Sequence, residues 1–290
     1  MLITAAIISG IGLGSMYGLI ALGFHVTYVV SSTVNFSQGS AMMLGAVLGY
    51  TFGVRLHWPM PLAVLAALVL CGLFGLVVER LLVRPFAERG SNGWLMATVA
   101  GGIVLENATL FTFGKEPRSF PSWLAEKPVD VFGAGAYPLQ LVIPLAGLGI
   151  AVVLHLVLHR TRIGKALLAV VQNPDAARLM GIDVRLAIAA SYAVSTMLAG
   201  IAGLLIAPLF SVHSEMGTLF GIKAFAVAIL GGLTSAWGVM LAGLAYGLIE
   251  AMATAYLGSV YTQIVAFSVV ILALTAMPNG LFGHAAVNKV

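Results

Sequence analysis

Long apolar runs follow one another along almost the whole 290-residue chain, and they constrain the fold more than any other feature. A transmembrane helix needs about 20 mostly apolar residues, and runs of about this length recur along the chain. Hydrophobic residues make up 60% of the chain and charged residues 8%, whereas about 25% of a typical soluble domain is charged. So few charges cannot cover a soluble surface. The sequence therefore predicts an all-α, polytopic transmembrane helical bundle, forming a single domain over residues 1–290.

The apolar runs predict nine spans, with eight and ten as alternatives because two of the runs are short. The nine runs cover residues 2–30, 41–54, 59–78, 94–113, 138–158, 186–208, 222–232, 237–257 and 260–277. Polar intervals at 31–40 and 210–221 precede the two short runs.

Basic residues are concentrated in two links between spans. The link 79–89 carries three arginines, and the link 159–185 carries Arg160, Arg162, Lys165, Arg178 and Arg185. Because cytoplasmic loops are enriched in Lys and Arg, both links are expected inside and the link 114–137 outside. The N-terminus is then outside and the tail with Lys289 inside. The net charge of +4 thus reflects membrane topology, and no nucleic-acid partner is expected.

A weak internal symmetry divides the chain into two sets of spans. Each set has a span, a polar interval, a short helix and two full spans, and the run 138–158 stands unpaired between the sets. The four spans of the first set and the unpaired span make five, so the second set has the opposite orientation in the membrane. An inverted repeat with a broken segment in each half points to a transport pathway near the bilayer midplane.

Three of the Asp, Glu, Lys and Arg residues fall within the predicted spans, namely Glu106, Lys223 and Glu250. A charge in hydrocarbon costs several kcal/mol unless it finds a partner. An ion pair between Lys223 and one of the two glutamates would be a structural explanation, and a protonated or hydrogen-bonded glutamate is an equal alternative. A role in substrate passage or gating stays open for all three residues.

The polar interval 31–40 is a stronger candidate for a solute path, since Asn35, Ser37 and Gln38 supply neutral donors and acceptors. Non-helical backbone at membrane depth is tolerated where it is buried in protein or lines a wet cavity. The alternative is a simple interhelical turn at the cytoplasmic surface. The counterpart of the interval 31–40 in the second set is the interval 211–223, where Gly217 and Gly221 could form a similar re-entrant turn.

The basic link 159–185 contains signals for a short helix. Asn173 before Pro174 reads as an N-cap with proline at the first helical position, Asp175 suits the positive end of the helix dipole, and Gly181 reads as a C-cap. Such a helix would present a small apolar face that suits docking into a groove of a partner. That face comprises Ala176, Ala177 and Met180.

Signatures of enzymes are scarce. The chain has no phosphate-binding loop, no H-E-x-x-H, no G-x-S-x-G and no cysteine pair. His155 and His159 are spaced for one helix face but have no third ligand nearby. We therefore expect no catalytic residues, no metal site, no cofactor and no enzymatic activity.

Motifs along nearly the whole chain resemble the permease subunits of ATP-binding-cassette importers for branched-chain amino acids. They are GSMYGLIALG at 14–23, VNFSQG at 34–39, MLG at 43–45, ERLLVRP at 79–85, AARLMGI at 176–182, GIKAF at 221–225, ILGGL at 229–233 and GLFG at 280–283. The resemblance implies a coupling helix in the loop 159–185, formed by a variant of the permease E-A-A-x-x-x-G motif. Its residues would be Asp175, Ala176, Ala177, Arg178 and Gly181.

The resemblance also implies partners and a location. They are a second permease subunit, two cytoplasmic subunits that bind the ATP, an external substrate-binding protein, an amino-acid substrate and the lipid of a bacterial cytoplasmic (inner) membrane. Where family members often have Ala-His, this chain has Ser37-Gln38, so urea or a small amide is an alternative substrate. A rival from another class is an ion-coupled secondary transporter that uses Glu106 or Glu250 as a proton relay.

Overall fold

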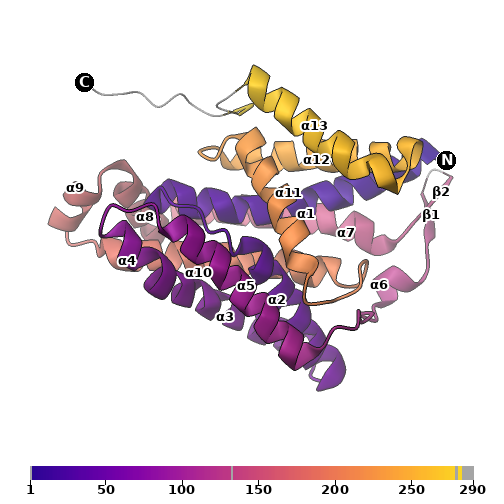
Figure 1. The fold of residues 1–290 in the computed structure, drawn as a ribbon, viewed down its shortest axis with the longest axis horizontal. Helices are drawn as coiled ribbons and strands as arrows, with labels where there is room; N and C mark the ends of the chain where they lie inside the picture. Colours follow the sequence, from indigo (N-terminus) through magenta and orange to yellow (C-terminus); the bar gives the residue numbers. More distant parts are fainter. Residues whose placement is uncertain (1, 132, 278–279, 283–290) are drawn as a thin grey trace.

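The computed structural model of the chain describes residues 2–131, 133–277 and 280–282 and is almost entirely helical (Figure 1). The longer helices are α1 (Leu2–Ser31), α2 (Gln38–Tyr50), α3 (Met60–Val77), α5 (Trp94–Phe113), α7 (Pro138–Arg160), α8 (Arg162–Gln172), α10 (Val184–Ile206), α11 (Met216–Gly231), α12 (Ala236–Leu257) and α13 (Ser259–Ala276). The short elements are the π-helical turns η1 (Thr51–Arg55) and η2 (Val78–Val83), the helices α4 (Arg84–Ala87), α6 (Trp123–Glu126) and α9 (Pro174–Leu179), and the strands β1 (Val129–Val131) and β2 (Ala134–Ala136).

Each predicted span corresponds to an apolar helix. Seven helices within the described ranges are long and apolar enough to cross a membrane, counting α3 with its continuation to Ala87, and α11 is a shorter apolar helix. The other short helix, α2, continues through η1 to Arg55. The prediction of an all-α, polytopic bundle is confirmed. One boundary was wrong: α11 begins at Met216 rather than near Ile222, so the second polar interval is shorter than predicted.

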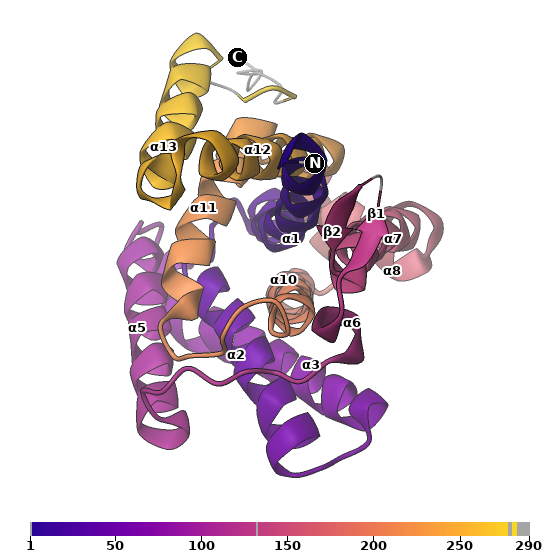
Figure 2. The same cartoon turned by 90° about the vertical axis from the view of Figure 1, so that its right-hand side faces the viewer.

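The two halves pack as an inverted repeat. The elements α1, α2, α3 and α5 recur in order as α10, α11, α12 and α13, with α7 between the two sets. The packing is exchanged between the halves, because α1 lies along α12 while α10 lies along α3. Likewise α1 contacts α11 and α10 contacts α2. Helices α1 and α10 therefore lie together in the middle of the bundle (Figure 2).

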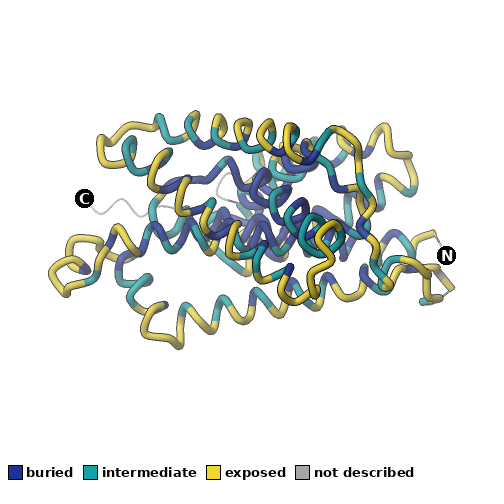
Figure 3. The backbone as a smooth tube through the Cα atoms, turned by 90° about the horizontal axis from the view of Figure 1, so that it is seen from below, coloured by how far each residue is buried: buried dark blue, intermediate teal, exposed yellow. Residues whose placement is uncertain are grey.

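Burial follows this arrangement (Figure 3). Helices α1, α10 and α12 are the most enclosed of the seven long apolar helices, while α5, α7 and α13 keep most of their residues at least partly exposed. The side chains exposed on these outer helices are mainly leucine, isoleucine and valine, as in Val104, Leu145 and Ile271. Apolar residues on the outside of a helical bundle are what a hydrocarbon environment requires. The chain is a multi-pass membrane protein.

The links between spans gather at two ends of the bundle. In Figure 1 the start of α1 lies at the same end as β1, β2 and α6, and the opposite end holds α4, α8 and α9. The two basic links therefore share one end, as their charge predicted. The C-terminal tail with Lys289, which was predicted to lie inside, falls outside the described residues.

Candidate functional site

The amino-terminal ends of the two short helices meet inside the bundle. Helix α2 begins at Gln38 and α11 begins at Met216, and each has glycine as its second residue. A Cβ atom added to Gly39 would lie 2.8 Å from the Cα atom of Gly221 and still closer to the carbonyl oxygen of Gly217. The predicted role of Gly217 and Gly221 in a turn was wrong, since both are helical. Their lack of side chains instead lets the two helices touch.

A carboxylate lies beside these two helix ends. Glu106 of α5 accepts hydrogen bonds from the hydroxyl of Ser40 at 3.1 Å and from that of Thr218 at 2.7 and 2.9 Å. Ser40 and Thr218 are both the third residue of their helix, so the inverted repeat places two equivalent hydroxyl groups on one carboxylate. The amino-terminal ends of helices carry partial positive charge and favour an anion nearby. Of the sequence alternatives for Glu106, the hydrogen-bonded glutamate is the one observed.

Glu106 separates two hollows on the face formed by α5 and α11. The first hollow has a volume of about 420 Å³, and polar residues such as Asn107, Ser214 and Glu215 contribute to its lining. The second hollow has a volume of about 250 Å³ and is mostly apolar. It is lined by Phe24, Phe36, Gly39, Ser40, Val99, Gly102, Ile103, Glu106, Gly217, Thr218, Gly221, Ile222 and Phe225. Glu106 therefore lies at the boundary between a polar hollow and a mostly apolar one.

Lys223 and Glu250 form a buried ion pair away from these hollows. The ammonium of Lys223 on α11 lies 2.5 Å from Glu250 Oε1 on α12 and 3.4 Å from the hydroxyl of Tyr17 on α1. The predicted ion pair is therefore observed, with Glu250 as the partner. Glu250 Oε2 and the hydroxyl of Tyr246 are buried without a hydrogen-bond partner among the described residues. Lys223 is the eighth residue of α11, whereas the eighth residue of α2, the equivalent helix in the first half, is Gly45. The position of Lys223 therefore carries no charge in the first half.

Asn35, Ser37 and Gln38 are fully buried, and their hydrogen bonds are made within the protein. Asn35 Oδ1 accepts from the hydroxyl of Ser37 at 2.6 Å. The Gln38 amide donates to the carbonyl oxygen of Ser195 on α10 at 2.8 Å, and the Ser195 hydroxyl donates back to Gln38 Oε1 at 2.9 Å. None of these three side chains lines either hollow beside Glu106. Their placement ties α2 to α10 and differs from the predicted wet lining.

The short helix α9 stands at the end of the molecule that holds the basic links (Figure 1). Its predicted caps are present: Asn173 accepts from the amides of Asp175 and Ala176 at 3.1 and 3.0 Å, and Gly181 has a φ angle of +82°. The amide of Ile182 donates to the carbonyl of Ala177 at 3.0 Å, which completes a Schellman ending. Asp175 and Arg178 form an exposed ion pair at 3.0 Å.

The apolar surface of α9 differs from the predicted one at one residue. Ala177 is buried against Val170, Val184 and Ala187, so it anchors α9 to α8 and α10 and is not part of an exposed face. Ala176 and Met180 are exposed, as predicted. Leu179, which was not predicted, is 89% exposed, and Met180 is 82% exposed. The exposed apolar tip of α9 is therefore Leu179 and Met180, which we call the α9 tip.

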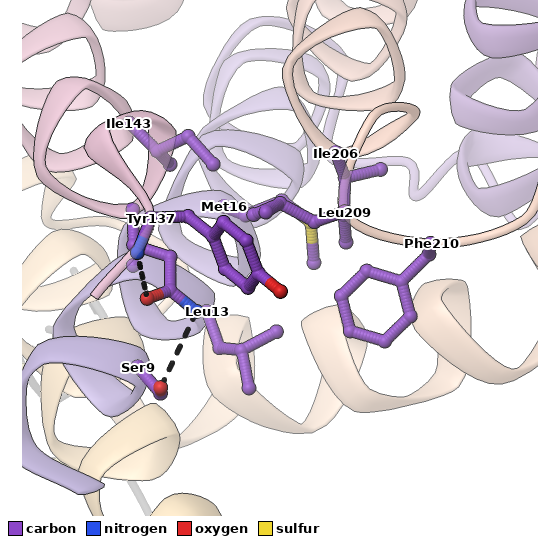
Figure 4. Close-up of a pocket in the computed structure, with 10 residues that line it drawn as sticks. Ser9, Leu13, Met16, Tyr137, Ile143, Ile206, Leu209 and Phe210 are labelled. Atoms are coloured by element: carbon purple, nitrogen blue, oxygen red, sulfur yellow. Dashed lines mark hydrogen bonds between the residues drawn. The ribbon is translucent and has the colours of Figure 1, made fainter. Parts of the chain in front are cut away.

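A further cavity of about 220 Å³ lies between α1, α7 and the end of α10. Gln140 links the backbone amide of Tyr137 to the hydroxyl of Ser9, through hydrogen bonds of 3.3 and 3.4 Å. Figure 4 draws these two bonds as dashed lines beside the labelled Tyr137 and Ser9. Apart from Ser9, Gln140 and the hydroxyl of Tyr137, the side chains around it are apolar, and none of the predicted site residues lines this cavity.

Sequence reasoning missed Ser40 and Thr218 as partners of Glu106, and it missed the aromatic wall beside them. The ring centroids of Phe36 and Phe225 are 4.9 Å apart. A signal for the two hydroxyl residues was present in the repeat, because each directly follows a glycine in the polar interval that precedes a short apolar run. Nothing in the sequence showed that α5 lies against both short helices.

Comparisons with known proteins agree with this architecture. The chain is 30% identical over 296 residues to the high-affinity branched-chain amino acid transport system permease protein LivH of Escherichia coli (strain K12), with 97% of this chain and 96% of LivH covered. It is 31% identical over 301 residues to the corresponding permease protein BraD of Pseudomonas aeruginosa, with 98% and 97% covered. The autoinducer 2 import system permease protein LsrD of Escherichia coli O9:H4 is more distant, at 26% identity over 74% of this chain and 64% of LsrD.

A chain in the solved structure of PsaBC from Streptococcus pneumoniae in complex with Fab has a similar fold, with a TM-score of 0.51 and 12% identity. The alignment covers 94% of this chain and 91% of that one. The family model for the permease component of the branched-chain amino acid transport system matches residues 6–274. The chain therefore belongs to the family of branched-chain amino acid transport permeases and is a permease subunit of a transporter.

Proposed function

We propose that this chain is one of two permease subunits of an ATP-driven importer for branched-chain or related amino acids in a bacterial cytoplasmic membrane. The α9 tip is the observation that carries the ATP-driven part of this proposal. Two large apolar side chains that are more than four-fifths exposed, on a capped helix outside the bundle, need a partner surface to cover them. A groove on a cytoplasmic ATPase subunit supplies such a surface.

The charge distribution supports an orientation with α4, α8 and α9 in the cytoplasm and the link 114–137 outside. In this orientation an external substrate-binding protein delivers the amino acid at the end that holds β1 and β2. One ATPase subunit docks at α9, and a second docks on the other permease subunit. ATP is bound by these partners, so the permease itself needs no cofactor and performs no covalent chemistry.

A continuous set of contacts connects α9 to the hollows beside Glu106. Ala177 of α9 packs on Val184 and Ala187 at the start of α10. Further along α10, Ser195 exchanges two hydrogen bonds with Gln38 at the start of α2. Two residues later, Ser40 donates to Glu106. Closure of the ATPase subunits on ATP would move α9, and α10 would carry this movement to the start of α2, switching access to the pathway.

The docking role of the α9 tip can be tested by purification of the full-length chain with its partner subunits. Replacing Leu179 and Met180 together with aspartate should remove the ATPase subunits from the purified complex, because two charges would replace the apolar contact. The second permease subunit should still copurify. The matched control is Trp123→Asp in α6, a side chain that is 79% exposed at the opposite end of the molecule. Full retention of the ATPase subunits by the double variant would contradict α9 docking.

A further inference from the structure

The apolar hollow beside Glu106 combines one carboxylate with an otherwise neutral lining. Apart from Glu106 and the hydroxyl residues Ser40 and Thr218, its side chains are aliphatic or aromatic. Phe36 and Phe225 pack against each other in its wall, and Val99 and Ile103 of α5 also line it. Its volume of about 250 Å³ exceeds the roughly 150 Å³ of an apolar cavity that holds benzene. It is therefore large enough for a small aliphatic solute.

The carboxylate of Glu106 has acceptor capacity left for such a solute. A carboxylate offers about four lone-pair sites. Each hydroxyl has only one hydrogen to donate, so Ser40 and Thr218 satisfy two of the four sites at any moment. The remaining sites suit an ammonium group, because charge-assisted hydrogen bonds are the strongest that such a group forms. The two hydroxyl groups hold the carboxylate in place at the edge of the apolar wall.

We propose that this hollow binds the transported solute within the membrane, with the solute ammonium on Glu106 and a branched aliphatic side chain against Phe36 and Phe225. The inference rests on the proposed function and adds where and how the substrate is held. Urea fits the hollow poorly, since it has neither a cationic group for Glu106 nor an apolar body for the aromatic wall. A dehydrated divalent cation fits poorly as well, because it needs six or more oxygen ligands and, among the described residues, the only lining side chains with oxygen atoms are Glu106, Ser40 and Thr218.

The test is equilibrium binding of radiolabelled leucine to the purified complex of permease and ATPase subunits in lipid nanodiscs, without the external binding protein. Two competitors each lack one charged group of leucine: isoamylamine lacks the carboxylate, and isocaproic acid lacks the ammonium. Isoamylamine should displace leucine, and isocaproic acid should not. Glu106→Gln should weaken leucine binding by about ten- to hundredfold and abolish the preference for the amine.

Two further variants separate this effect from misfolding. Glu126→Gln removes an exposed carboxylate of α6 and should bind leucine as the wild type does. Val99→Trp fills the hollow from a side chain that is 39% exposed, so it should block binding without lowering the melting temperature.

Unchanged leucine affinity in Glu106→Gln, equal competition by isocaproic acid, or no leucine binding by the wild-type complex would each overturn the proposal. Unchanged leucine affinity together with loss of the second permease subunit would assign Glu106 to the contact between the two permeases. None of these results depends on ATP-driven uptake by the wild-type complex, so a failure of the proposed function is detected separately.

Discussion

The Lys223→Met variant is expected to lose about 3 to 5 kcal/mol of folding stability. Removing one member of a buried ion pair leaves the other charge without compensation, and Glu250 already has one carboxylate oxygen without a partner among the described residues. The pair joins α11 to α12 and contacts Tyr17 of α1, so its loss should loosen the second half of the bundle. Thermal unfolding of the purified chain in a fixed detergent measures the effect.

Two companion variants show whether the charge itself is responsible. The double variant Lys223→Met with Glu250→Leu should regain most of the lost stability, since replacing a whole buried pair by apolar residues is often neutral. Glu88→Gln removes one member of the exposed pair between Glu88 and Arg185 and should cost less than about 1 kcal/mol. A double variant no more stable than Lys223→Met would show that uncompensated charge is not the cause.

Gly39→Ala is expected to lower both the melting temperature and the rate of uptake, although it adds a single methyl group. Alanine normally stabilises a helix relative to glycine by about 0.5 to 1 kcal/mol. At Gly39 the new Cβ would meet backbone atoms of Gly217 and Gly221, which cannot rotate away as a side chain would. Overpacking of this kind typically costs about 1 to 3 kcal/mol, and it would push apart the helix ends that hold Ser40 and Thr218 on Glu106.

Gly149→Ala is the matched control, because Gly149 lies in the helix α7 and no described residue comes within 4 Å of a Cβ atom added there. This variant should be as stable as the wild type or slightly more so. Melting curves and uptake by the assembled transporter measure both variants. Equal behaviour of the two alanine variants would refute a close contact between α2 and α11.

The sequence predicted the spans well because a membrane requires each one to be long and apolar. It misplaced the start of α11, since Thr218 and two glycines in Met216–Gly221 look like a turn when read locally. These residues form a helix whose glycines meet α2. Likewise, the pattern of a short capped helix at Asn173–Gly181 was correct, but the burial of Ala177 depends on Val170 and Val184 in neighbouring helices.

The candidate site was predictable only in part, for the same physical reason. A buried lysine needs a carboxylate, so an ion pair of Lys223 with Glu106 or Glu250 could be anticipated, and the fold selects Glu250. The hydrogen bonds of Glu106 join residues that are 66 and 112 positions apart. They arise because α5 packs on α2 and its Glu106 also reaches Thr218 of α11, which apolar periodicity does not specify. Asn35, Ser37 and Gln38 were recognised as unusual, yet the partner of Gln38 on α10, Ser195, was not visible in the sequence.

Uptake of radiolabelled leucine into proteoliposomes tests the central claim most directly. The vesicles would contain the permease subunits and the ATPase subunits, with ATP enclosed at the ATPase side and the external binding protein supplied on the other. We expect uptake that requires ATP, stops with vanadate and continues when an uncoupler abolishes the proton gradient. Uptake that collapses with the uncoupler while ATP is present, and that proceeds without ATPase subunits, would contradict the account and identify an ion-coupled secondary transporter.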